Sequence, residues 1–415
     1  MKYGLIGKSL DHSYSKLIHE QLNSNPYDLL SINETELDSL LKTKDFLGIN
    51  VTIPYKEIVK KSLDEIDEIA NEIGSVNTIV NFNGKLKGFN TDYYGLKELF
   101  IHSNINVKNK NCYILGSGGT KNTAVKVLKD LEAKTITVVS RKVSDKTISY
   151  EEFNSRNDVE IIVNTTPVGM YPNIEEEIID LKLFPSLEGV IDVVYNPYQT
   201  RLVTKSKELG IKSIGGLRML VSQGIKASEL FLNKEYTSST FTKIYSSLYY
   251  LRRNIVLIGM PMSGKTTIGK ALAKSLNKKF VDLDEEIENI AKMSIPEIFS
   301  TYGEDYFRKL EKDITLQYSK ETNLVISTGG GIIKNYDNIL NLKANGILVH
   351  LTRDINKLEY SSNRPLTKNI EEYKKLKEER FEIYKKYQDY QIDNSSSIEE
   401  CINEIMEVFN ESINY

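Results

Sequence analysis

Short apolar runs alternate with longer amphipathic segments along most of this chain. Such runs are typical of buried strands, whereas apolar residues at helical spacing predict helices that cover a sheet. The alternation therefore predicts an α/β fold whose sheets are parallel and carry helices on their faces. The predicted strands span residues 2–6, 46–53, 112–115, 135–139, 160–163 and 190–193, followed by a second series at 254–258, 280–282, 324–326 and 347–351.

Two of the predicted strands run directly into glycine-rich turns, in YILGSGGTKNTA and NIVLIGMPMSGKTTIG. Each turn opens a predicted helix, and the N-terminus of a helix offers backbone N–H donors and a positive dipole end to a phosphate. Two such turns predict two separate nucleotide sites. A length of 415 residues likewise predicts roughly two or three folding units.

The boundary between the two halves is predicted near Leu251, in the polar stretch TSSTFTKIYSSLYYLRR. The preceding segment, LVSQGIKASELFLNKEY, has apolar residues at helical spacing. Because the polar stretch itself holds aromatic and apolar residues, we expect a packed helix or docking segment there and not a loose tether.

The composition excludes several classes of function. Hydrophobic residues make up 40% of the chain and charged residues 27%, as in soluble globular proteins, and the net charge of -3 gives no global attraction to nucleic acid. No apolar stretch approaches the ~20 residues that cross a bilayer, and the N-terminus lacks the apolar core of a secretory signal. Cys112 and Cys401 have no metal-ligand spacing. We therefore expect a cytoplasmic protein with small-molecule ligands and neither nucleic acid nor membrane as partner, either a monomer or a homodimer.

The front glycine turn contains Gly116, Gly118 and Gly119, whose lack of side chains lets the backbone approach a pyrophosphate. Position 121, where the dinucleotide-binding fingerprint has its third glycine, is Lys121. From this element alone, a strand-to-helix turn without a ligand is an equally good interpretation.

The next predicted strand ends in Ser140, Arg141 and Lys142 instead of an acidic residue. An acidic side chain at this place accepts a hydrogen bond from a ribose 2′-hydroxyl, whereas an arginine pairs with the 2′-phosphate of NADP. A solvated basic pair is the alternative, but the position at the strand end favours an NADP site.

Hydroxyl and amide side chains gather upstream in HSYS (12–15), GINVTIPYK (48–56), GSVNT (74–78) and GFNTD (88–92). Such groups at strand ends suit a polyhydroxy ligand, which needs both donors and acceptors. Among them, Lys56 and Asp92 form a candidate acid/base pair. The lysine can protonate a carbonyl oxygen as hydride arrives, and the carboxylate can orient the lysine. Taken singly, each could be a surface charge.

GMPMSGKT, residues 259–266, fits the phosphate-loop pattern between a predicted strand and a predicted helix. In this pattern backbone N–H groups surround the phosphates, Lys265 reaches the outer ones, and Thr266 is a magnesium ligand. Asp282 and Asp284 lie two residues apart at the end of a later strand, so both can face one cleft. One can support the metal, and the other can accept a proton from an attacking hydroxyl.

Three further features of the back half suit ligand binding. Arg308 and Arg380 can grip a carboxylate with their guanidinium groups, although either could be only a surface helix residue. STGGGII, residues 327–333, lets backbone approach a ligand closely. Arg364, in the polar stretch SSNRPLTK, suits a mobile lid that meets developing phosphate charge.

The front region, roughly residues 1–233, resembles shikimate dehydrogenase along its whole length and in the family's order. The matching segments are GKSLDHSYSKLIH, GINVTIPYK, IGSVNT, GFNTDYYG, ILGSGGT, SRK, NTTPVGMYP, DVVYNPYQTRL and GGLRMLVSQG. The resemblance implies reduction of 3-dehydroshikimate to shikimate by NADPH, with Lys56 and Asp92 as the acid/base pair. It further implies substrate contacts at Ser13, Ser15, Thr52, Asn77, Asn90, Tyr195 and Gln223, and NADP(H) contacts at Gly116, Ser117, Gly118, Gly119, Thr120, Ser140, Arg141, Lys142, Thr165 and Gly216.

Some positions of the front half depart from the family pattern. Lys16 stands where the family usually has proline, the cofactor loop carries Lys121 and a shifted Ala124, and Lys142 replaces the common threonine. The departures in and after the loop bear on cofactor affinity and leave the chemistry of the acid/base pair untouched.

The back region, about residue 253 to the end, resembles shikimate kinase, with GMPMSGKTTIG, FVDLDEEIE, YGEDYFRKLE, STGGG, RPL and RFEIY in the family's order. The resemblance implies ATP- and Mg2+-dependent phosphorylation of the shikimate 3-hydroxyl, with catalysis by Lys265, Asp284 and Arg364. It implies ATP contacts at Gly259, Met262, Ser263, Gly264, Lys265, Thr266 and Thr267, metal ligands at Thr266 and Asp282, and shikimate contacts at Asp284, Arg308, Gly329, Gly330, Gly331 and Arg380.

Because the product of the first reaction is the substrate of the second, the two resemblances support a bifunctional enzyme of aromatic amino acid biosynthesis. The expected organisation is an α/β substrate lobe at 1–100 with C-terminal helices at about 218–250 packing back on it, a Rossmann NADP lobe at 101–235, a connecting segment at 236–252, and a P-loop kinase α/β domain with a parallel sheet at 253–415. Two alternatives stay open. One is a shikimate-sensing regulatory protein that has lost catalysis, and the other is a dehydrogenase that accepts quinate or NAD, although Arg141 argues against NAD.

Overall fold

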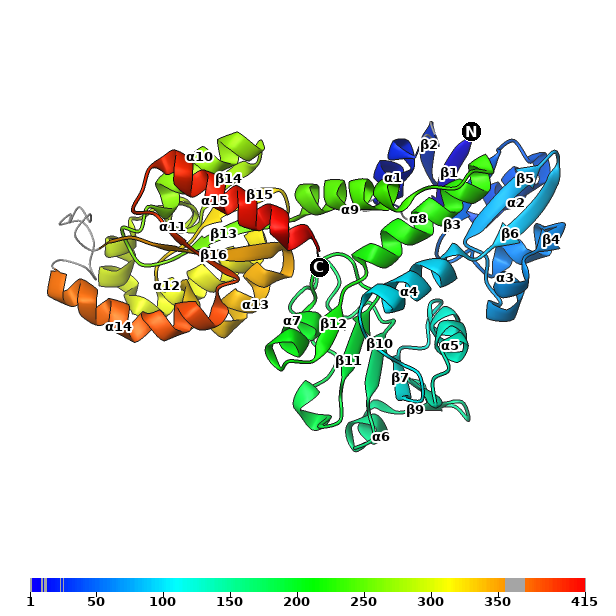
Figure 1. Ribbon diagram of the computed structural model, residues 1–415, viewed down its shortest axis with the longest axis horizontal. Helices are drawn as coiled ribbons and strands as arrows, with labels where there is room; N and C mark the ends of the chain where they lie inside the picture. Colours follow the sequence, from blue (N-terminus) through cyan, green and yellow to red (C-terminus); the bar gives the residue numbers. More distant parts are fainter. Residues whose placement is uncertain are drawn as a thin grey trace. The chain divides into compact units, whose positions relative to one another are not determined.

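The computed structural model describes residues 2–8, 10, 13–22, 24, 26–354 and 370–414. The chain forms two compact units (Figure 1), one made of Met1–Met170 and Glu176–Ser247 and the other of Tyr171–Glu175 and Leu248–Tyr415. Within the described residues, the N-terminal unit is built on two six-stranded sheets and the C-terminal unit on one five-stranded sheet.

The first sheet of the N-terminal unit is mixed. Its strands, in the order in which they lie side by side, are β2 (Tyr27–Ser31), β1 (Tyr3–Gly7), β3 (Gly48–Val51), β5 (Thr78–Phe82), β6 (Lys85–Phe89) and β4 (Glu65–Ile66). Strands β1, β2 and β3 pair in parallel, whereas β5 runs antiparallel to both β3 and β6. The expectation of parallel sheets throughout is therefore wrong for this sheet.

The antiparallel pairing follows from the tight turn that joins β5 to β6. Asn83 and Gly84 both have positive φ, 52° and 91° respectively. A two-residue turn of this kind matches the twist of an antiparallel hairpin, and Asn-Gly is its strongest sequence signal. The letters NG between two short runs could therefore have predicted this hairpin.

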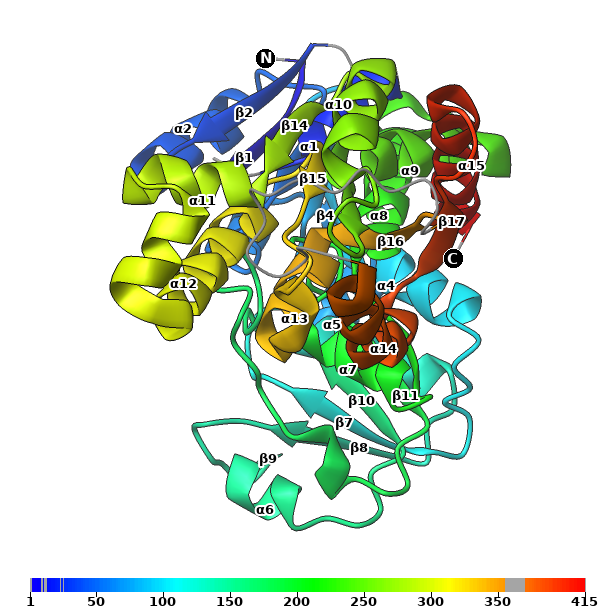
Figure 2. The same cartoon turned by 90° about the vertical axis from the view of Figure 1, so that its left-hand side faces the viewer.

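The second sheet of the N-terminal unit is parallel. Its strands, again in spatial order, are β12 (Lys212–Ile214), β11 (Gly189–Asp192), β10 (Ile161–Asn164), β7 (Asn111–Leu115), β8 (Thr135–Val139) and β9 (Thr147–Ile148). Figure 2 shows β7, β8, β10 and β11 running side by side. This is the strand order of doubly wound dinucleotide-binding folds, and it reverses between β7 and β10. Ligands of such sheets bind in the crevice outside the carboxyl ends of the strands at this switch point.

The helices of the N-terminal unit are α1 (Ser15–Gln21), α2 (Glu34–Thr43), α3 (Glu68–Ile73), α4 (Thr91–His102), α5 (Lys121–Asp130), α6 (Tyr150–Asn154), α7 (Arg201–Glu208) and α8 (Leu217–Leu232). Helices α4 and α8 lie against each other (Figure 1), and α8 also contacts α1 and β5. Gly95 makes the approach possible, because a Cβ there would lie 2.5 Å from the carbonyl oxygen of Met219. Helix α8 therefore packs on elements of the first sheet and on α4, the helix that leads into β7 of the second sheet.

A buried histidine on α1 gives this unit a predicted dependence on pH. His19 is 1% exposed, its ring stacks on that of Tyr27 with 4.2 Å between centroids, and burial lowers its pKa to about 3. In the unfolded chain a histidine binds a proton below about pH 6.5, whereas the folded unit keeps His19 neutral down to about pH 3. The free energy of unfolding therefore falls as the pH drops below about 6.5, by about 1.4 kcal/mol per pH unit.

We expect His19→Phe, which keeps a stacked ring but cannot bind a proton, to remove this contribution. Urea unfolding followed by circular dichroism at about pH 7.5 and pH 5.5 checks the expectation. The wild type should lose about 1 kcal/mol more than the variant between the two conditions. Equal losses in the two proteins would show that His19 is protonated in the folded chain.

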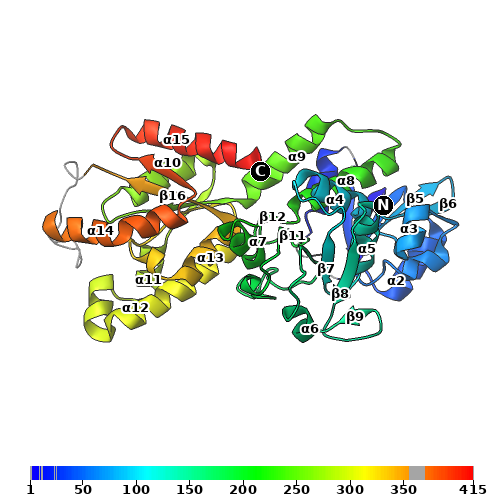
Figure 3. The ribbon, with the colours of Figure 1, turned by 60° about the horizontal axis from the view of Figure 1, so that its bottom comes forward.

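The C-terminal unit contains a parallel sheet with the spatial order β14 (Lys279–Asp282), β15 (Leu324–Ser327), β13 (Asn254–Ile258), β16 (Gly346–Thr352) and β17 (Tyr390–Asp393). Its helices are α10 (Lys265–Leu276), α11 (Leu283–Ala291), α12 (Ile295–Lys320), α13 (Tyr336–Asn345), α14 (Ile370–Tyr387) and α15 (Ile398–Glu411). Helices α10 and α15 cover one face of the sheet, and α12, α13 and α14 lie on the other (Figures 1 and 3). The strands β13, β14 and β15 end at the same edge, so the loops that follow them meet there.

The segment expected to connect the two halves is largely helical. Helix α9 spans Ser238–Arg252, and its last residues belong to the C-terminal unit. Buried Lys278 holds this end of the helix, because its Nζ donates to the carbonyl oxygens of Tyr250 and Arg253 at 2.6 and 3.0 Å. Burial lowers the pKa of Lys278 to about 8. None of the helices in the described part of the chain combines the length and the apolar character that a membrane span needs.

Candidate active sites

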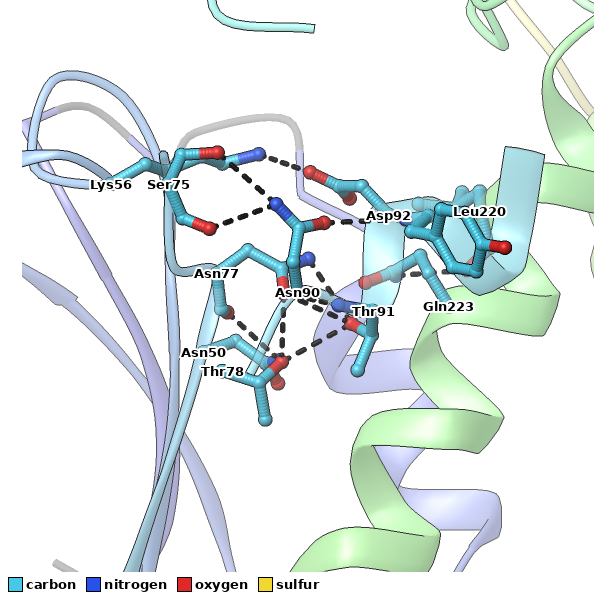
Figure 4. Close-up of polar contacts among 11 residues, drawn as sticks. Asn50, Lys56, Ser75, Asn77, Thr78, Asn90, Thr91, Asp92, Leu220 and Gln223 are labelled. Atoms are coloured by element: carbon cyan, nitrogen blue, oxygen red, sulfur yellow. Dashed lines mark hydrogen bonds and ion pairs between the residues drawn. The ribbon is translucent and has the colours of Figure 1, made fainter. Parts of the chain in front are cut away.

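Lys56 and Asp92 meet at the edge of the first sheet. Lys56 lies in the turn after β3, and Asp92 lies in the first turn of α4. The Lys56 Nζ lies 2.5 Å from Asp92 Oδ2, and the two side chains are 22% and 15% exposed. The structure thus brings together the two residues predicted as an acid/base pair (Figure 4). A carboxylate that holds an ammonium in a partly desolvated place fixes the direction in which the ammonium can give a proton.

Asn77, directly before β5, is buried and already forms hydrogen bonds within the fold (Figure 4). Its Oδ1 accepts hydrogen bonds from the Thr91 backbone N–H at 2.7 Å and the Thr78 hydroxyl at 3.1 Å, and its Nδ2 donates to the Thr91 hydroxyl at 3.1 Å. A side-chain amide has two acceptor sites and two N–H donors. The group that Asn77 can still offer to a ligand is therefore one N–H donor.

Asn90 caps helix α4 and, unlike Asn77, can offer a ligand an acceptor and not a donor. Its Oδ1 accepts from the backbone N–H of Tyr93 at 3.2 Å, and its Nδ2 donates to the backbone oxygen and the hydroxyl of Ser75 at 3.0 and 3.1 Å. Both donors are used, so only one acceptor site remains. The same contacts fix the first turn of α4 and hence the position of Asp92.

Ser13, Ser15 and Tyr195 lie around the start of α1. The backbone N–H of Ser15 donates to the Ser13 hydroxyl at 3.3 Å. Tyr195 follows β11, and its ring meets the edge of Tyr14 with 5.6 Å between centroids. The structure therefore places residues of both sheets around this helix start, as a site between a substrate lobe and a cofactor lobe requires.

Gln223 and Thr52 come from two further segments. Gln223 lies on α8, its Nε2 donates to the carbonyl oxygen of Leu220 at 2.9 Å, and a Cβ on Gly95 of α4 would lie 3.0 Å from its Cβ (Figure 4). Thr52 follows β3, and its backbone N–H donates to the carbonyl oxygen of Ile6 at 2.9 Å. Both side chains are partly buried, so they can meet a ligand.

Sequence reasoning did not single out Ser75, Thr78 and Thr91, which hold the two amides in place. A fourth such residue is Asn50, whose Nδ2 donates to the Thr78 hydroxyl at 3.0 Å. All of them lie inside the motifs GINVTIPYK, GSVNT and GFNTD, so the signal was present. Which of several neighbouring polar side chains faces the ligand depends on strand pairing, and motif spacing does not determine it.

The front glycine turn lies at the switch point of the second sheet. Gly116 has φ of 102°, and a Cβ there would lie 2.7 Å from Cγ2 of Thr166, so glycine is needed where β7 and β10 end together. At Gly118 and Gly119, an added Cβ would have no atom of the described residues within 4 Å apart from the glycine itself and its chain neighbours. Open space over these two glycines, at the start of α5, fits a dinucleotide pyrophosphate. Ser117 and Thr120 complete the turn.

The end of β8 is bonded to this turn. The hydroxyl groups of Ser117 and Ser140 lie 2.9 Å apart, and the Ser140 hydroxyl also accepts from the backbone N–H of Lys142 at 3.1 Å. Arg141 and Lys142 are exposed, so their charges are available to a 2′-phosphate.

Thr165 and Gly216 lie where further segments converge on the same crevice. The Thr165 hydroxyl donates to the carbonyl oxygen of Leu115 at 2.8 Å, which joins the ends of β10 and β7. A Cβ on Gly216 would lie 2.2 Å from the carbonyl oxygen of Val193, so α8 begins directly against the residue that follows β11. The residues predicted to contact NADP(H) are therefore gathered at one edge of the sheet.

The back phosphate loop joins β13 to α10. Lys265 is 8% exposed, and its Nζ donates to the carbonyl oxygens of Gly259 and Met260 at 3.0 and 2.9 Å. Met262 has φ of 66°, an uncommon conformation for a residue with a side chain, which the motif letters do not predict. The loop thus curls around its own lysine, as a phosphate cradle requires.

The C-terminal side of this loop is held by the segment after β17. Asn394 Nδ2 donates to the carbonyl oxygen of Ser263 at 2.9 Å, and a Cβ on Gly264 would lie 2.3 Å from the same nitrogen. Gly264 has φ of 91°, so both its conformation and its close contact require glycine. Thr267 follows in the first turn of α10.

Thr266 and Asp282 are placed to hold a divalent cation. The Thr266 hydroxyl donates to Asp282 Oδ2 at 2.7 Å, and Asp282 Oδ1 caps α11 by accepting from the backbone N–H of Asp284 at 3.1 Å. Hydroxyl and carboxylate oxygens are the ligands that Mg2+ prefers, usually together with substrate phosphates. The described residues contain no cluster of three or more His, Cys, Asp or Glu side chains that could bind a metal alone. One hydroxyl and one carboxylate suit an ion that also takes ligands from substrate phosphates.

Residues predicted to bind the phosphoryl acceptor lie against the glycine triplet that follows β15. A Cβ on Gly329 would lie 2.7 Å from Asp284 Oδ1, and a Cβ on Gly331 would lie 2.7 Å from the guanidinium nitrogens of Arg308. If either glycine were alanine, the side chain of Asp284 or Arg308 that lies against it would have to move. The triplet therefore makes room for a carboxylate and a guanidinium group that point to one region.

Arg380, from α14, reaches the middle glycine. Its Nη1 donates to the carbonyl oxygen of Gly330 at 2.6 Å, and the Tyr384 hydroxyl donates to the same oxygen at 2.7 Å. Arg380 is 2% exposed, and its Nε and Nη2 have no hydrogen-bond partner among the described residues. Buried unsatisfied guanidinium donors fit a ligand that brings acceptor oxygens, such as a carboxylate.

Glu311 is a site residue that sequence reasoning missed. Its Oε2 accepts from Arg308 Nη1 at 2.8 Å, and the Glu311 side chain is 2% exposed. Burial raises the pKa of Glu311, and the charge of Arg308 opposes that rise. The spacing of three residues on one helix face could have identified this partner of Arg308. Arg364, the predicted lid arginine, lies outside the described residues.

Comparisons with known proteins found relatives of both parts of the chain. Residues 5–79 match the family model of the shikimate dehydrogenase substrate binding domain, and residues 261–410 match that of shikimate kinase. The chain is 38% identical over 264 residues to the shikimate dehydrogenase (NADP(+)) of Clostridium perfringens, which covers 59% of this chain and 97% of that protein.

Among solved structures, the chain is similar to a chorismate mutase/shikimate 5-dehydrogenase fusion protein from Clostridium acetobutylicum, with 36% identity, a TM-score of 0.56, and coverage of 59% of this chain and 96% of that chain. It is also similar to the shikimate 5-dehydrogenase of Thermus thermophilus in complex with NADP(H) and shikimate, with 26% identity, a TM-score of 0.53, and coverage of 59% and 98%. This chain therefore belongs to the shikimate dehydrogenase family over its N-terminal part and carries a shikimate kinase domain in its C-terminal part.

Proposed function

We propose that this chain reduces 3-dehydroshikimate to shikimate with NADPH and phosphorylates shikimate at its 3-hydroxyl with ATP. The observation that supports the proposal is that each unit brings together residues suited to bind a nucleotide and residues suited to bind and act on a substrate. In the N-terminal unit, Lys56 lies against Asp92 and a glycine turn lies at the switch point of the second sheet. In the C-terminal unit, Lys265 lies inside the GMPMSGKT loop and Arg308 lies beside Gly331.

In the reduction, bound NADPH would supply the hydride, and residues of the chain would handle the proton and the ring. Lys56 would donate its proton to the carbonyl oxygen as negative charge develops there, while Asp92 holds the ammonium in place. The free N–H of Asn77 and the free acceptor site of Asn90 would bind ring hydroxyls. A hydroxyl both donates and accepts, so these two amides are complementary to a polyhydroxy acid.

In the phosphorylation, Asp284 would accept the proton of the attacking hydroxyl, and Lys265 would stabilise charge on the transferred phosphoryl group. Arg308 and Arg380 would bind the acceptor carboxylate through charge-assisted hydrogen bonds. Thr266 and Asp282 would hold Mg2+, which offsets phosphate charge when bound. Arg364 would add a further positive charge from the lid.

The test is a coupled assay with purified protein, 3-dehydroshikimate, NADPH, ATP and Mg2+, followed by mass spectrometry of the product. We expect consumption of NADPH and formation of shikimate 3-phosphate, and accumulation of shikimate when ATP is omitted. Absence of NADPH consumption would contradict the first activity. Consumption of NADPH that stops at shikimate in the presence of ATP would contradict the second.

We expect Gly331→Ala to raise KM for shikimate in the kinase reaction by about 10-fold or more, because a charge-assisted hydrogen bond contributes about 1.5–3 kcal/mol. The added Cβ would lie 2.7 Å from the tip of the Arg308 side chain, which is flexible enough to move aside without unfolding the domain. Steady-state kinetics with varied shikimate measure the effect, and KM for ATP should change less. The dehydrogenase activity of the same preparation is the control, and an unchanged KM for shikimate would show that Arg308 does not bind it.

A further inference from the structure

Asp192, the last residue of β11, is a buried carboxylate that belongs to none of the predicted sites. It is 0% exposed, and its Oδ1 accepts from Asn164 Nδ2 and from the backbone N–H of Val194, both at 3.0 Å. Its Oδ2 accepts from the Thr200 hydroxyl at 2.6 Å. Among the described residues, no lysine or arginine forms an ion pair with it.

The three donors belong to different segments around the cofactor crevice. Asn164 ends β10, and its Oδ1 in turn accepts from the backbone N–H and the hydroxyl of Thr166, at 3.0 and 2.7 Å. The turn that carries Thr165 is therefore fixed through Asn164. Thr200 is the N-cap of α7, where its hydroxyl accepts from the backbone N–H of Val203.

Val194 connects the carboxylate to two more predicted contact residues. It precedes Tyr195, and its carbonyl oxygen accepts from the backbone N–H of Gly216 at 2.9 Å. Thr165 and Gly216 were predicted to contact the cofactor, and Tyr195 the substrate. One side chain thus determines how the segments of all three residues are spaced.

A charged side chain at this buried position lowers the stability of the fold. Burying a carboxylate without a cation is unfavourable, and burial raises the pKa of Asp192 to about 6, against the effect of its three hydrogen bonds. An asparagine would offer one acceptor oxygen and a donor group, so it could not accept from all three partners. An ionised carboxylate can accept from all three donors at once.

We propose that Asp192 is a positioning residue of the dehydrogenase site, which aligns Thr165 and Gly216 on the cofactor side with Tyr195 on the substrate side. This inference rests on the proposed function for its kinetic consequences, but not for its effect on NADP+ binding. Misalignment should weaken binding of both ligands. A merely structural defect would instead lower the fraction of active enzyme, and so kcat, with KM unchanged.

The experiment compares Asp192→Asn, Thr200→Val and Thr200→Ser in the full chain. We expect the first two to raise Kd for NADP+, measured by calorimetry, and KM for NADP+ and shikimate by about 10-fold, the value of one hydrogen bond to a charged group. Thr200→Ser keeps the hydroxyl and should behave as the wild type. The kinase activity of each preparation serves as an internal standard for protein concentration.

Glu160→Gln is the matched control, because it also converts a carboxylate to an amide but at the opposite end of the same sheet, where Glu160 accepts from the Asn111 backbone N–H at 2.8 Å. Its Kd and KM values should stay at those of the wild type. Asp192→Asn with unchanged Kd and KM, or a Thr200→Ser variant as impaired as Thr200→Val, would overturn the inference. If the wild type oxidises no shikimate, the proposed function fails, and the comparison of Kd for NADP+ still decides the role of Asp192.

Discussion

We expect Lys56→Met to lower kcat for NADP-linked oxidation of shikimate by about 10²- to 10⁴-fold, the usual contribution of a positioned general acid–base group. Lys56 is the group that lies 2.5 Å from Asp92 and can exchange a proton with the reacting oxygen. Methionine keeps the apolar stem of the lysine and removes only the ammonium. Initial rates of NADPH formation at saturating shikimate and NADP+ measure the change.

Lys61→Met is the matched control, because it removes an exposed lysine farther along the same segment and outside the predicted site. Its kcat should lie within about twofold of the wild type, since most surface substitutions have small effects. The kinase activity of the Lys56 variant should also be retained. If Lys56→Met kept most of its dehydrogenase activity, or if both activities were lost in a folded protein, the assignment of Lys56 to one of two independent sites would be wrong.

The parallel strands are the part of the fold that sequence reasoning predicted best. Residues 135–139 and 254–258 were predicted to be strands, and β8 and β13 have the same bounds. Strand β13 is buried along its whole length, and its apolar run ends at a glycine. Strand β8 is less buried, but its β-branched residues favour a strand. Among the missed strands, β6 is half-buried, and an alternating pattern over five residues is a weaker signal than a continuous run.

The candidate sites show a similar division. The motif letters identified Lys56, Asp92, Lys265 and Asp282, because proton transfer and phosphate binding require particular residue types. They could not show that the free group of Asn77 is a donor and that of Asn90 an acceptor. The difference arises because the Thr91 backbone N–H uses the acceptor of Asn77, whereas Ser75 uses the donors of Asn90. These residues meet only once β5 and β6 have paired and α4 has formed.

Glycines illustrate the same limit. The STGGG letters indicated a close backbone approach, but not what approaches. In the structure Arg308 lies against Gly331, and Asp284 lies against Gly329, from helices α12 and α11 that are distant in sequence from the triplet. Contacts between such segments follow from the strand order of the sheet, and a single sequence does not give that order.

We expect Lys265→Met to lower kcat for ATP-dependent phosphorylation of shikimate by about 10²- to 10³-fold or more, because phosphoryl transfer depends on fixed positive charge at the phosphates. In the structure the Lys265 ammonium donates to the carbonyl oxygens of Gly259 and Met260, so it lies inside the curl of the loop. A coupled assay of ADP release at saturating shikimate and ATP measures the loss.

Lys274→Met, on the same helix but exposed, controls for the removal of a positive charge from α10. It should keep kinase activity within about twofold, since exposed charges contribute little. NADP-linked oxidation of shikimate should be unchanged in both variants, because each unit carries its own nucleotide site. A Lys265 variant that phosphorylates shikimate at the wild-type rate would mean that GMPMSGKT does not bind the transferred phosphate. Loss of both activities in that variant would mean that the two sites are not independent, which their separate strands and separate glycine turns argue against.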